Sequence, residues 1–333
     1  MKKKKLEPGI TFIDLFAGIG GMRIGFERNG GKCVFSSEID ESSQNMYECN
    51  FNEKPYGDIQ KINATDIPDH DVLVAGFPCQ AFSIIGDRLG FADTRGTLFF
   101  EIERILKEKR PKAFLLENVK QLVSHNRGKT LKVILLKLKK LGYFVHYKIL
   151  NGLDFGVPQK RERVILVGFQ KNYPFHFPQG LKGNKKELSD ILEPDNKVDK
   201  SYFLSSHMKT KFRKRVDINP FSPSIWHENK SGNIGIHPYS CALRAGASYS
   251  YLSVNGVRRL TSREMLRLQG FPDSFKIIGT YTQIRRQAGN SVVVPKIQAV
   301  ACEIVKSLSC IPLKPTLQYA LFDEGEEERV YAY

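Results

Sequence analysis

The stretch FIDLFAGIGG, residues 12–21, decides the fold of this chain. Its β-prone first half and its three closely spaced glycines are typical of a strand that runs into a tight turn and then a helix. A turn of this kind lets the backbone approach a ligand closely. A dinucleotide-binding turn would carry a further glycine where Arg23 stands. The stretch therefore favours an adenosyl site over a phosphate cradle.

The alternation of strand and helix patterns that begins at this stretch continues to about residue 169. Short β-prone runs are separated by segments of helical spacing, which is the signature of βαβ units in a parallel sheet. The predicted strands are 11–15, 33–37, 71–75, 112–116, 143–150 and 163–168. We therefore predict an α/β fold with a doubly wound, mostly parallel sheet and a second, smaller and irregular domain.

The rest of the chain changes character twice. Between about 170 and 257, Pro, Gly, Asn and Ser are scattered through weakly periodic segments, which indicates a separate irregular domain. Thr261 and Glu264 then have the spacing of a helix capping box, and Pro295 opens a last helix that is apolar on one side. The predicted domains are 1–169, 170–257 and a return segment, 258–333, whose final helix packs on the first domain.

Composition narrows the class of protein. Lys and Arg number 51 against 35 Asp and Glu, a net charge of +16, which favours a polyanionic partner because neutralised phosphates release counterions. A lysine-rich composition without such a partner explains the charge equally well. The six cysteines form no CxxC pair, and no apolar run is long enough to cross a bilayer. We expect a soluble, cytoplasmic protein without a metal site.

Reactive side chains stand where predicted strands end, the edge at which open α/β sheets bind ligands. Glu38 ends the second strand, Cys79 lies in the loop after the third, and Glu117 ends the fourth. A lone cysteine in such a loop is more often a small buried apolar residue than a nucleophile. The nearby carboxylate and the alternating Gln and Arg residues of QKRER, residues 159–163, favour the nucleophile.

Six short motifs follow one another over nearly the whole chain. They are FAGIGG (16–21), PCQ (78–80), ENV (117–119), QKRER (159–163), RLTSREMLRLQGFP (259–272) and GNSV (289–292). In this order the chain resembles the bacterial cytosine-5 DNA methyltransferases of restriction-modification systems. The resemblance implies the Rossmann-like methyltransferase fold.

The resemblance implies four catalytic residues, Cys79, Glu117, Arg161 and Arg163. A thiolate at Cys79 would add to carbon 6 of cytosine and so make carbon 5 nucleophilic. Glu117 would hold the proton at ring nitrogen 3, and Arg163 would pair with the carbonyl oxygen.

The implied methyl donor is S-adenosylmethionine, with no metal. The residues that the resemblance assigns to it are Phe16, Gly18, Ile19, Gly20, Gly21, Glu38, Ile39, Asp58, Ile59, Pro78, Asn290 and Ser291. Glu38 would bind the ribose and Asp58 the adenine amino group. Ile39 departs from the aromatic residue that relatives often carry, so we expect the adenine to be stacked on one face only.

The implied substrate is double-stranded DNA with the target cytosine flipped out of the helix. The irregular domain would read the sequence, and the predicted DNA contacts are Gln80, Ser83, Arg244 and Arg258. We expect a monomer, paired in the cell with a restriction endonuclease that acts on the same site.

Three alternatives remain at this point. A transfer RNA methyltransferase of the same chemistry would need no recognition domain of this length. A catalytically silent DNA-binding protein would not need Cys79 and Glu117 together. A nicotinamide dehydrogenase is disfavoured by Arg23.

Overall fold

A six-stranded sheet organises the computed structural model, which describes residues 9–77 and 98–313 except 182, 184, 215, 217, 218, 230, 249 and 250. In spatial order the strands are β2 (Lys32–Ser37), β1 (Thr11–Leu15), β3 (Val72–Gly76), β4 (Ala113–Val119), β7 (Glu162–Phe169) and β5 (Phe144–Asn151). The first four are parallel, and β7 is antiparallel to both of its neighbours. The predicted α/β class with a mostly parallel sheet is confirmed.

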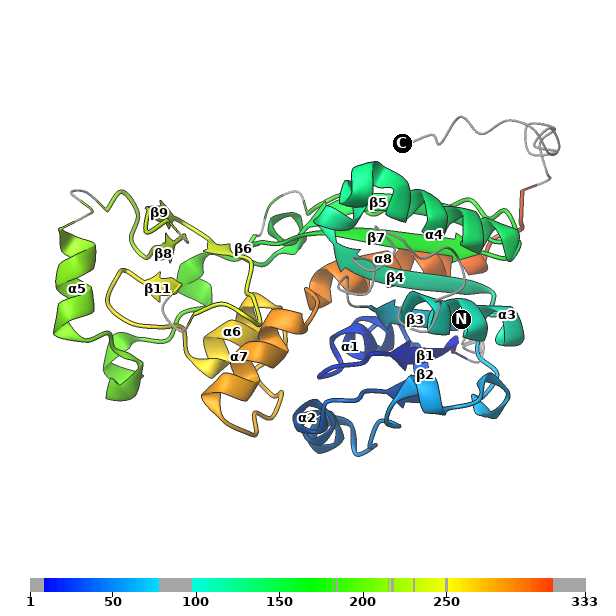
Figure 1. Cartoon of the computed structure of the whole chain (residues 1–333), viewed down its shortest axis with the longest axis horizontal. Helices are drawn as coiled ribbons and strands as arrows, with labels where there is room; N and C mark the ends of the chain where they lie inside the picture. The colour runs from blue at the N-terminus through cyan, green and yellow to red at the C-terminus, as the bar shows by residue number, and fades with distance from the viewer. Residues whose placement is uncertain are drawn as a thin grey trace, which may run out of the picture.

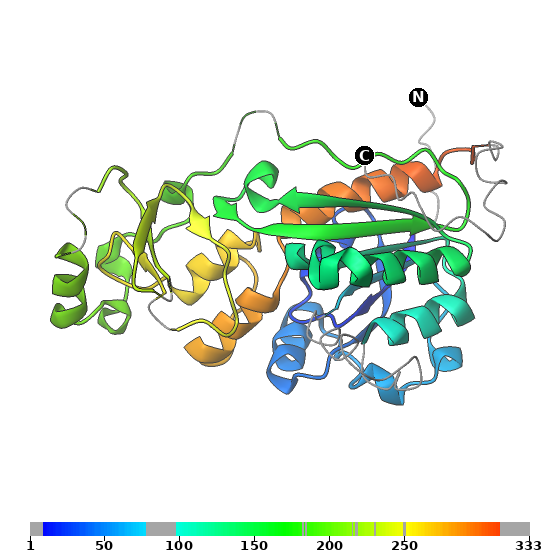
Figure 2. The ribbon, with the colours of Figure 1, turned by 45° about the horizontal axis from the view of Figure 1, so that its top comes forward.

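Helices cover both faces of the sheet (Figures 1 and 2). On one face lie α1 (Gly21–Glu27) and α8 (Val294–Leu308), and on the other lie α3 (Leu98–Lys109) and α4 (Lys129–Lys140). Alternate strand residues supply the two cores, as the pleat of a strand requires. Phe12 of β1 packs with α1 and α8, whereas its neighbour Ile13 packs with α3 and α4.

The final helix packs on the six-stranded sheet. Pro295 lies in the first turn of α8, and the apolar side of the helix is buried against the sheet and α1. Gly25 permits this approach, since a Cβ atom there would lie 2.7 Å from the Ile297 side chain.

The smaller lobe consists of the elements from Leu188 to Asn290 and lies beyond one end of the sheet (Figure 1). Its strands are β8 (Ile225–Glu228), β9 (Ile234–His237) and β11 (Leu252–Val254), in the order β11-β8-β9, and its helices are α5 (Ser206–Arg213), α6 (Ser262–Leu268) and α7 (Tyr281–Asn290). It is more regular than the sequence predicts. A short parallel pair, β6 (Gln159–Lys160) and β10 (Ser240–Cys241), joins it to the first domain.

One apolar core crosses the predicted boundary at residue 257. It includes Ile225 and Leu243 from before that boundary and Leu266 and Ile284 from after it. The helices α6 and α7 therefore belong to the core of the smaller lobe. Both begin with a capping box, and the one that begins at Thr261 confirms the sequence prediction.

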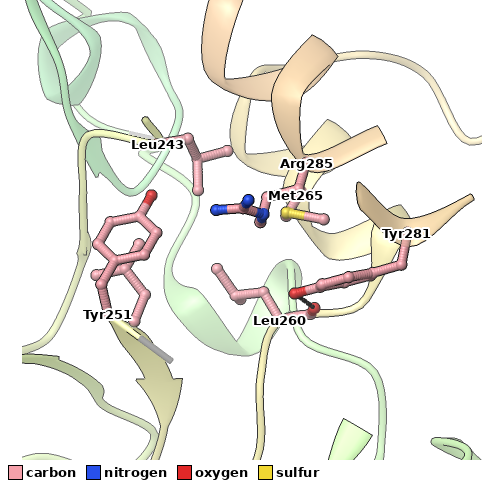
Figure 3. A pocket seen from close by; sticks show the side chains of 7 residues that line it. Leu243, Tyr251, Leu260, Met265, Tyr281 and Arg285 are labelled. Carbon is pink, nitrogen blue, oxygen red and sulfur yellow. Dashed lines mark hydrogen bonds between the residues drawn. The ribbon is translucent and has the colours of Figure 1, made fainter. Parts of the chain in front are cut away.

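A small cavity lies in the seam between the two parts of this core (Figure 3). Its lining residues are Leu243, Tyr251, Leu252, Leu260, Met265, Tyr281 and Arg285. These residues include none of the predicted catalytic or cofactor residues.

The remaining helical segments and the edge of the sheet complete the fold. Helix α2 (Glu41–Phe51) follows β2 at that edge. The short 3-10 turns are η1 (Ile59–Lys61), η2 (Ala64–Asp66), η4 (Lys120–Val123), η5 (His125–Gly128), η6 (Gly152–Phe155), η7 (Leu188–Asp190), η8 (Asp195–Lys197) and η9 (Lys200–Tyr202). In the described part of the chain, no helix has the length and apolar character that a membrane span needs.

Candidate active site

The glycine turn after β1 has the left-handed backbone that its sequence predicts. Gly18 and Gly20 have φ angles of 55° and 84°, and Gly20 is the N-cap of α1. A Cβ atom on Gly20 would lie 2.3 Å from the ring of Phe51, whereas a Cβ on Gly18 would meet no atom within 4 Å. The turn is therefore closed behind Gly20 and open at Gly18, where a ligand could approach the backbone.

Glu38 is fixed beside the open side of this turn. Its carboxylate accepts hydrogen bonds of 2.8 Å from the backbone N–H groups of Gly18 and Asp40. Its own backbone N–H donates to the carbonyl of Tyr56 over 2.9 Å, which brings the segment leading to Asp58 alongside. Ile39 is 72% exposed at this edge, an apolar surface next to a carboxylate that retains acceptor capacity. The arrangement fits a nucleoside.

The predicted cofactor residues at the far end of the chain reach the same turn. A Cβ atom on Gly21 would lie 2.9 Å from the hydroxyl oxygen of Ser291. Gln287 of α7 donates a hydrogen bond of 3.1 Å to the Ser42 hydroxyl at the start of α2. Asn290 is exposed at the end of α7. The first contact places Ser291, which follows Asn290 in the chain, beside the glycine turn.

The loop that carries the predicted nucleophile begins beside Glu117. Gly76, the last residue of β3, is paired in register with Glu117 of β4. Asn118 donates a hydrogen bond of 3.0 Å to the carbonyl of Phe77 and so fixes the last described residue before the loop. The predicted site residues Pro78, Cys79, Gln80 and Ser83 lie outside the described residues.

Glu117 and Arg163, predicted to be catalytic, lie together. Arg163 Nε is 3.4 Å from Glu117 Oε1, and Glu117 is 8% exposed. Antiparallel pairing of β4 with β7 causes this proximity, since Val119 lies opposite Arg163. A carboxyl group and a guanidinium at one strand end can act together on a polar ring.

Arg161 has different neighbours. Its guanidinium donates to the carbonyl oxygens of Leu243, Gly289 and Ser291 over 2.8, 2.9 and 2.6 Å. The sequence predicts a catalytic Arg161, but these bonds to backbone carbonyls are those of a positioning residue that joins the smaller lobe to the GNSV motif.

Gln159 and Asn118 are site residues to which sequence reasoning gave no role. Gln159 donates to the Leu268 carbonyl over 2.8 Å and accepts from the Leu243 N–H over 3.0 Å. Both residues are buried polar side chains within predicted motifs, and a buried amide must find partners. This requirement is the sequence signal from which a structural role for Gln159 and Asn118 could have been predicted.

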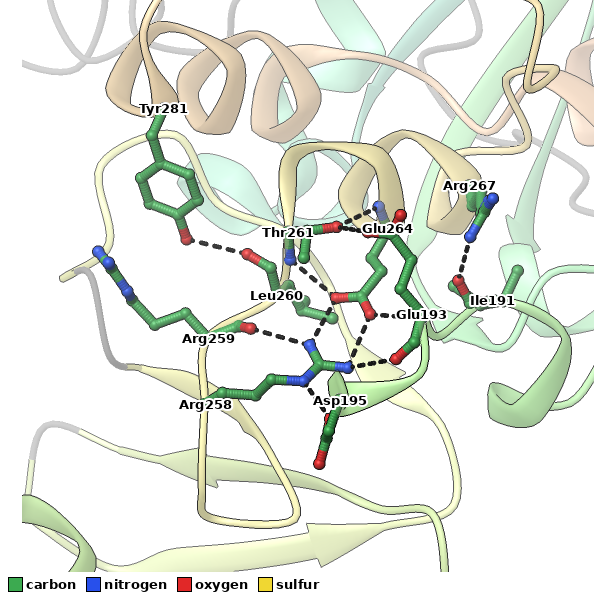
Figure 4. A network of polar contacts seen from close by, with 10 residues as sticks. All are labelled: Ile191, Glu193, Asp195, Arg258, Arg259, Leu260, Thr261, Glu264, Arg267 and Tyr281. Carbon is green, nitrogen blue, oxygen red and sulfur yellow. Dashed lines mark hydrogen bonds and ion pairs between the residues drawn. The ribbon is translucent and has the colours of Figure 1, made fainter. Parts of the chain in front are cut away.

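Arg258 was predicted to contact DNA, and the structure corrects this prediction (Figure 4). Its side chain is 1% exposed. It donates to both carboxylate oxygens of Glu264 over 2.9 Å, to Asp195 over 2.6 Å and to the Glu193 carbonyl over 3.0 Å. A buried Glu264 within the capping box needs a cation, and Arg258 is that cation.

Arg244, the other predicted arginine contact, is exposed. Its guanidinium carbon lies 4.9 Å from the centroid of the Tyr251 ring, and its backbone N–H donates to the Tyr251 hydroxyl over 2.8 Å. The Arg244 side chain therefore lies at the surface and packs on the ring of the buried Tyr251.

Known proteins resemble this chain over most of its length. A family model described as C-5 cytosine-specific DNA methylase matches residues 10–306. The Type II methyltransferase M.HaeII of Haemophilus aegyptius is 60% identical over 313 residues, which are 93% of this chain and 98% of the relative. M.NgoBI of Neisseria gonorrhoeae is 60% identical over 287 residues, 86% of this chain and 90% of the relative.

Solved structures of low sequence identity share the fold. The methyltransferase EhMeth of Entamoeba histolytica superposes with a TM-score of 0.72 at 20% identity, covering 91% of this chain and 99% of that chain. A putative DNA modification methyltransferase encoded in an E. coli prophage gives 0.69 at 22% identity, covering 90% and 100%. With the predicted family confirmed, the chain belongs to the C-5 cytosine-specific DNA methylase family and is a DNA cytosine-5-methyltransferase.

Proposed function

We propose that this enzyme transfers a methyl group from S-adenosylmethionine to carbon 5 of a flipped-out cytosine in a specific double-stranded sequence, through a transient covalent bond to Cys79. The observation that supports this most is the convergence at one sheet edge of the Glu117–Arg163 pair, the end of β3 and the open glycine turn. The proposed cofactor site after β1, the loop after β3 and the Glu117–Arg163 pair thus follow one another along the same edge of the sheet.

The chemistry can be written for the residues of this chain. The Cys79 thiolate donates an electron pair to carbon 6 of cytosine, and a proton on Glu117 is held at ring nitrogen 3 as electrons move there. Arg163 stabilises the charge on the carbonyl oxygen. Bound S-adenosylmethionine supplies an electrophilic methyl group on its sulfonium. After the methyl is on carbon 5, loss of the proton from that carbon and departure of the Cys79 thiolate restore the aromatic ring.

The residues present fit the proposed cofactor. Glu38, whose two oxygens each accept one backbone hydrogen bond, retains lone pairs for ribose hydroxyls. Gly18 leaves open space for the nucleoside, and the exposed Ile39 offers an apolar surface to an adenine face. Ser291 and Asn290 would hold the amino-acid end, with Pro78 outside the described residues.

DNA recognition is proposed for the smaller lobe, with Arg244 as a contact. The net charge of +16 suits a polyanionic substrate. We further propose that the enzyme acts in the cytoplasm as a monomer and protects DNA from a restriction endonuclease of the same specificity. The relatives that share 60% identity are named type II methyltransferases, which supports this system.

A trapping experiment tests the nucleophile. Genomic fragments amplified with 5-fluorocytosine in place of cytosine should form a denaturation-resistant complex with the enzyme when S-adenosylmethionine is added, because fluorine cannot leave as a proton does. Cys79→Ser should form none, and Cys310→Ser, which alters an exposed cysteine, should trap like the wild type. Trapping by Cys79→Ser would refute the assignment. Trapping of RNA and not of duplex DNA would refute the substrate.

A further inference from the structure

Helix α2 is attached to the smaller lobe near both of its ends. Near its last residue, Asn50 donates to the carbonyl of Lys276 over 3.0 Å, and the N–H of Lys276 donates back to the Asn50 side chain over 2.8 Å. Near its first residue, Gln287 of α7 donates to the Ser42 hydroxyl over 3.1 Å. This second contact is close in the chain to Glu38, the residue proposed to bind the ribose of the cofactor.

Hydrogen bonds connect Gln287 with Glu38. The Ser42 hydroxyl, which accepts from Gln287, donates to the Asp40 carboxylate over 2.6 Å. The backbone N–H of Asp40 then donates to Glu38 Oε1 over 2.8 Å, and the N–H of Gly18 donates to the other Glu38 oxygen over 2.8 Å. The carboxylate proposed for the ribose is therefore linked to a helix of the smaller lobe.

The backbone of Gln287 contacts the opposite side of the proposed cofactor site. Its carbonyl accepts a hydrogen bond of 2.9 Å from the N–H of Ser291. Ser291 in turn lies against the glycine turn, since a Cβ atom on Gly21 would be 2.9 Å from its hydroxyl oxygen. One residue thus binds Ser291 through its backbone and the segment that carries Glu38 through its side chain.

Capping of α2 does not by itself explain the position of Gln287. Asp40 is the N-cap of α2, and its carboxylate accepts from the backbone N–H of Ser43 over 3.0 Å, so the cap is complete without a partner from the smaller lobe. Gln287 is 5% exposed, and its Oε1 has no hydrogen-bond partner among the described residues. Packing alone would favour an apolar side chain here, because a buried amide with an unsatisfied oxygen is costly.

We propose that Gln287 is a positioning residue that raises the affinity for S-adenosylmethionine by holding the two sides of its site together before the cofactor binds. The inference rests on the cofactor site proposed above. The Gln287 side chain fixes Glu38 for the ribose through Ser42, and its backbone fixes Ser291 for the amino-acid end. Because both sides are already in place, cofactor binding does not have to order them, and less free energy is lost on binding.

The test is calorimetric titration of the enzyme with S-adenosylmethionine in the absence of DNA. Gln287→Met keeps the length of the side chain and removes the amide, so the link through Ser42 is lost. We expect the dissociation constant to rise by about five- to tenfold, the effect of one hydrogen bond that orders a site. At saturating cofactor, the single-turnover rate on unmethylated bacterial genomic DNA should stay within about twofold of the wild type, because Glu117 and Arg163 are unchanged.

A double-mutant cycle with Ser42 tests the route. Ser42→Ala removes the hydroxyl that accepts the Gln287 hydrogen bond, so this variant alone should also weaken binding. If Gln287 acts through Ser42, the enzyme with both substitutions should bind within about twofold of the weaker single variant, and the two losses should not multiply. Ser42 is only partly buried, so Ser42→Ala still tests the link if Gln287→Met fails to fold.

Two control variants separate this role from a general loosening of the lobes. Asn50→Ala removes the other contact between α2 and the smaller lobe. Gln283→Met removes the capping box of α7, the helix that carries Gln287. Both should lower the temperature of thermal unfolding and leave the dissociation constant for S-adenosylmethionine within about twofold of the wild type.

Three results would overturn the inference: wild-type affinity in Gln287→Met, losses that multiply in the double variant, or an equal loss of affinity in either control. A fourth variant, Glu38→Ala, distinguishes failure of the cofactor site itself. Wild-type affinity in Glu38→Ala would refute the proposed site. Weak binding by Glu38→Ala together with normal binding by Gln287→Met would refute the role of Gln287 alone.

Discussion

At the scale of single residues, the buried carboxyl group of Asp14 should make the stability of the protein depend on pH. It lies in β1, is 0% exposed, and burial is the largest cause that raises its pKa to about 8, with Arg23 opposing. The folded protein therefore retains a proton that the unfolded chain releases above about pH 4. Its contribution to stability is complete below that pH and is lost as pH rises towards 8.

Asp14→Asn removes this titration and tests it. The free energy of unfolding of the variant relative to the wild type should increase as pH rises from 5 to 8, by at most about 1.4 kcal/mol per pH unit. Urea unfolding at several pH values measures the difference. The exposed Asp66→Asn variant serves as the control and should show no such trend. A constant difference for Asp14→Asn would mean that Asp14 is ionised in the folded protein.

At the scale of elements, Gly18 and Gly20 of the turn after β1 should serve different purposes, cofactor binding and packing respectively. In Gly18→Ala the new methyl group would project into open space, whereas in Gly20→Ala it would meet the ring of Phe51. Both variants carry the backbone strain of a left-handed alanine, about 1 kcal/mol. Gly20→Ala should lose clearly more stability than Gly18→Ala, and Gly18→Ala should lose more affinity for S-adenosylmethionine than its stability loss explains. Calorimetry combined with thermal unfolding separates the two effects, and equal affinity of Gly18→Ala and the wild type would place the cofactor elsewhere.

The Arg258–Glu264 ion pair at the start of helix α6 is expected to contribute measurably to stability. Glu264 is 0% exposed, and Arg258 is the cation that compensates it. Arg258→Met should lower the free energy of unfolding by about 3–5 kcal/mol, because it leaves a buried carboxylate unpaired. Arg258→Met combined with Glu264→Gln should recover part of the loss, while the exposed Arg286→Ala should cost little. A loss of DNA affinity in Arg258→Met without a loss of stability would restore the sequence prediction of a DNA contact.

Features with a strong local sequence pattern could be predicted from the sequence, whereas short strands and long-range contacts could not. The six sheet strands can be predicted because each contains a short run rich in β-prone residues between helical segments, and β1 matches the prediction residue for residue. The strands β8, β9 and β11 have three or four residues each, too few for a period to be recognised. Helix α7 was missed although Thr280 and Gln283 form a capping box at its start. Glu117 and Arg163 could be predicted as a pair from motifs. The carbonyl partners of Arg161 are 82 or more positions away, and Asp195, which binds Arg258 together with the nearby Glu264, is 63 positions away, so these contacts depend on tertiary packing.

At the scale of the whole molecule, the smaller lobe and the sheet have different proposed tasks. We predict that replacing residues 170–257 with the equivalent segment of a family member of different, known target will move methylation to the donor's sequence and keep carbon 5 as the acceptor. Because one apolar core joins Leu243 to Leu266 and Ile284, such a chimera should also unfold at a lower temperature than either parent. An active chimera that still marks the original sequence would place recognition outside this segment.

The most direct test of the account is to express the chain in a bacterial host without cytosine methylation and to map modified bases across the genome. The account predicts 5-methylcytosine at nearly every copy of one short sequence, and none when Cys79→Ser is expressed at the same level. Methylation of an exocyclic nitrogen, methylation confined to RNA, or 5-methylcytosine that persists in Cys79→Ser would contradict it.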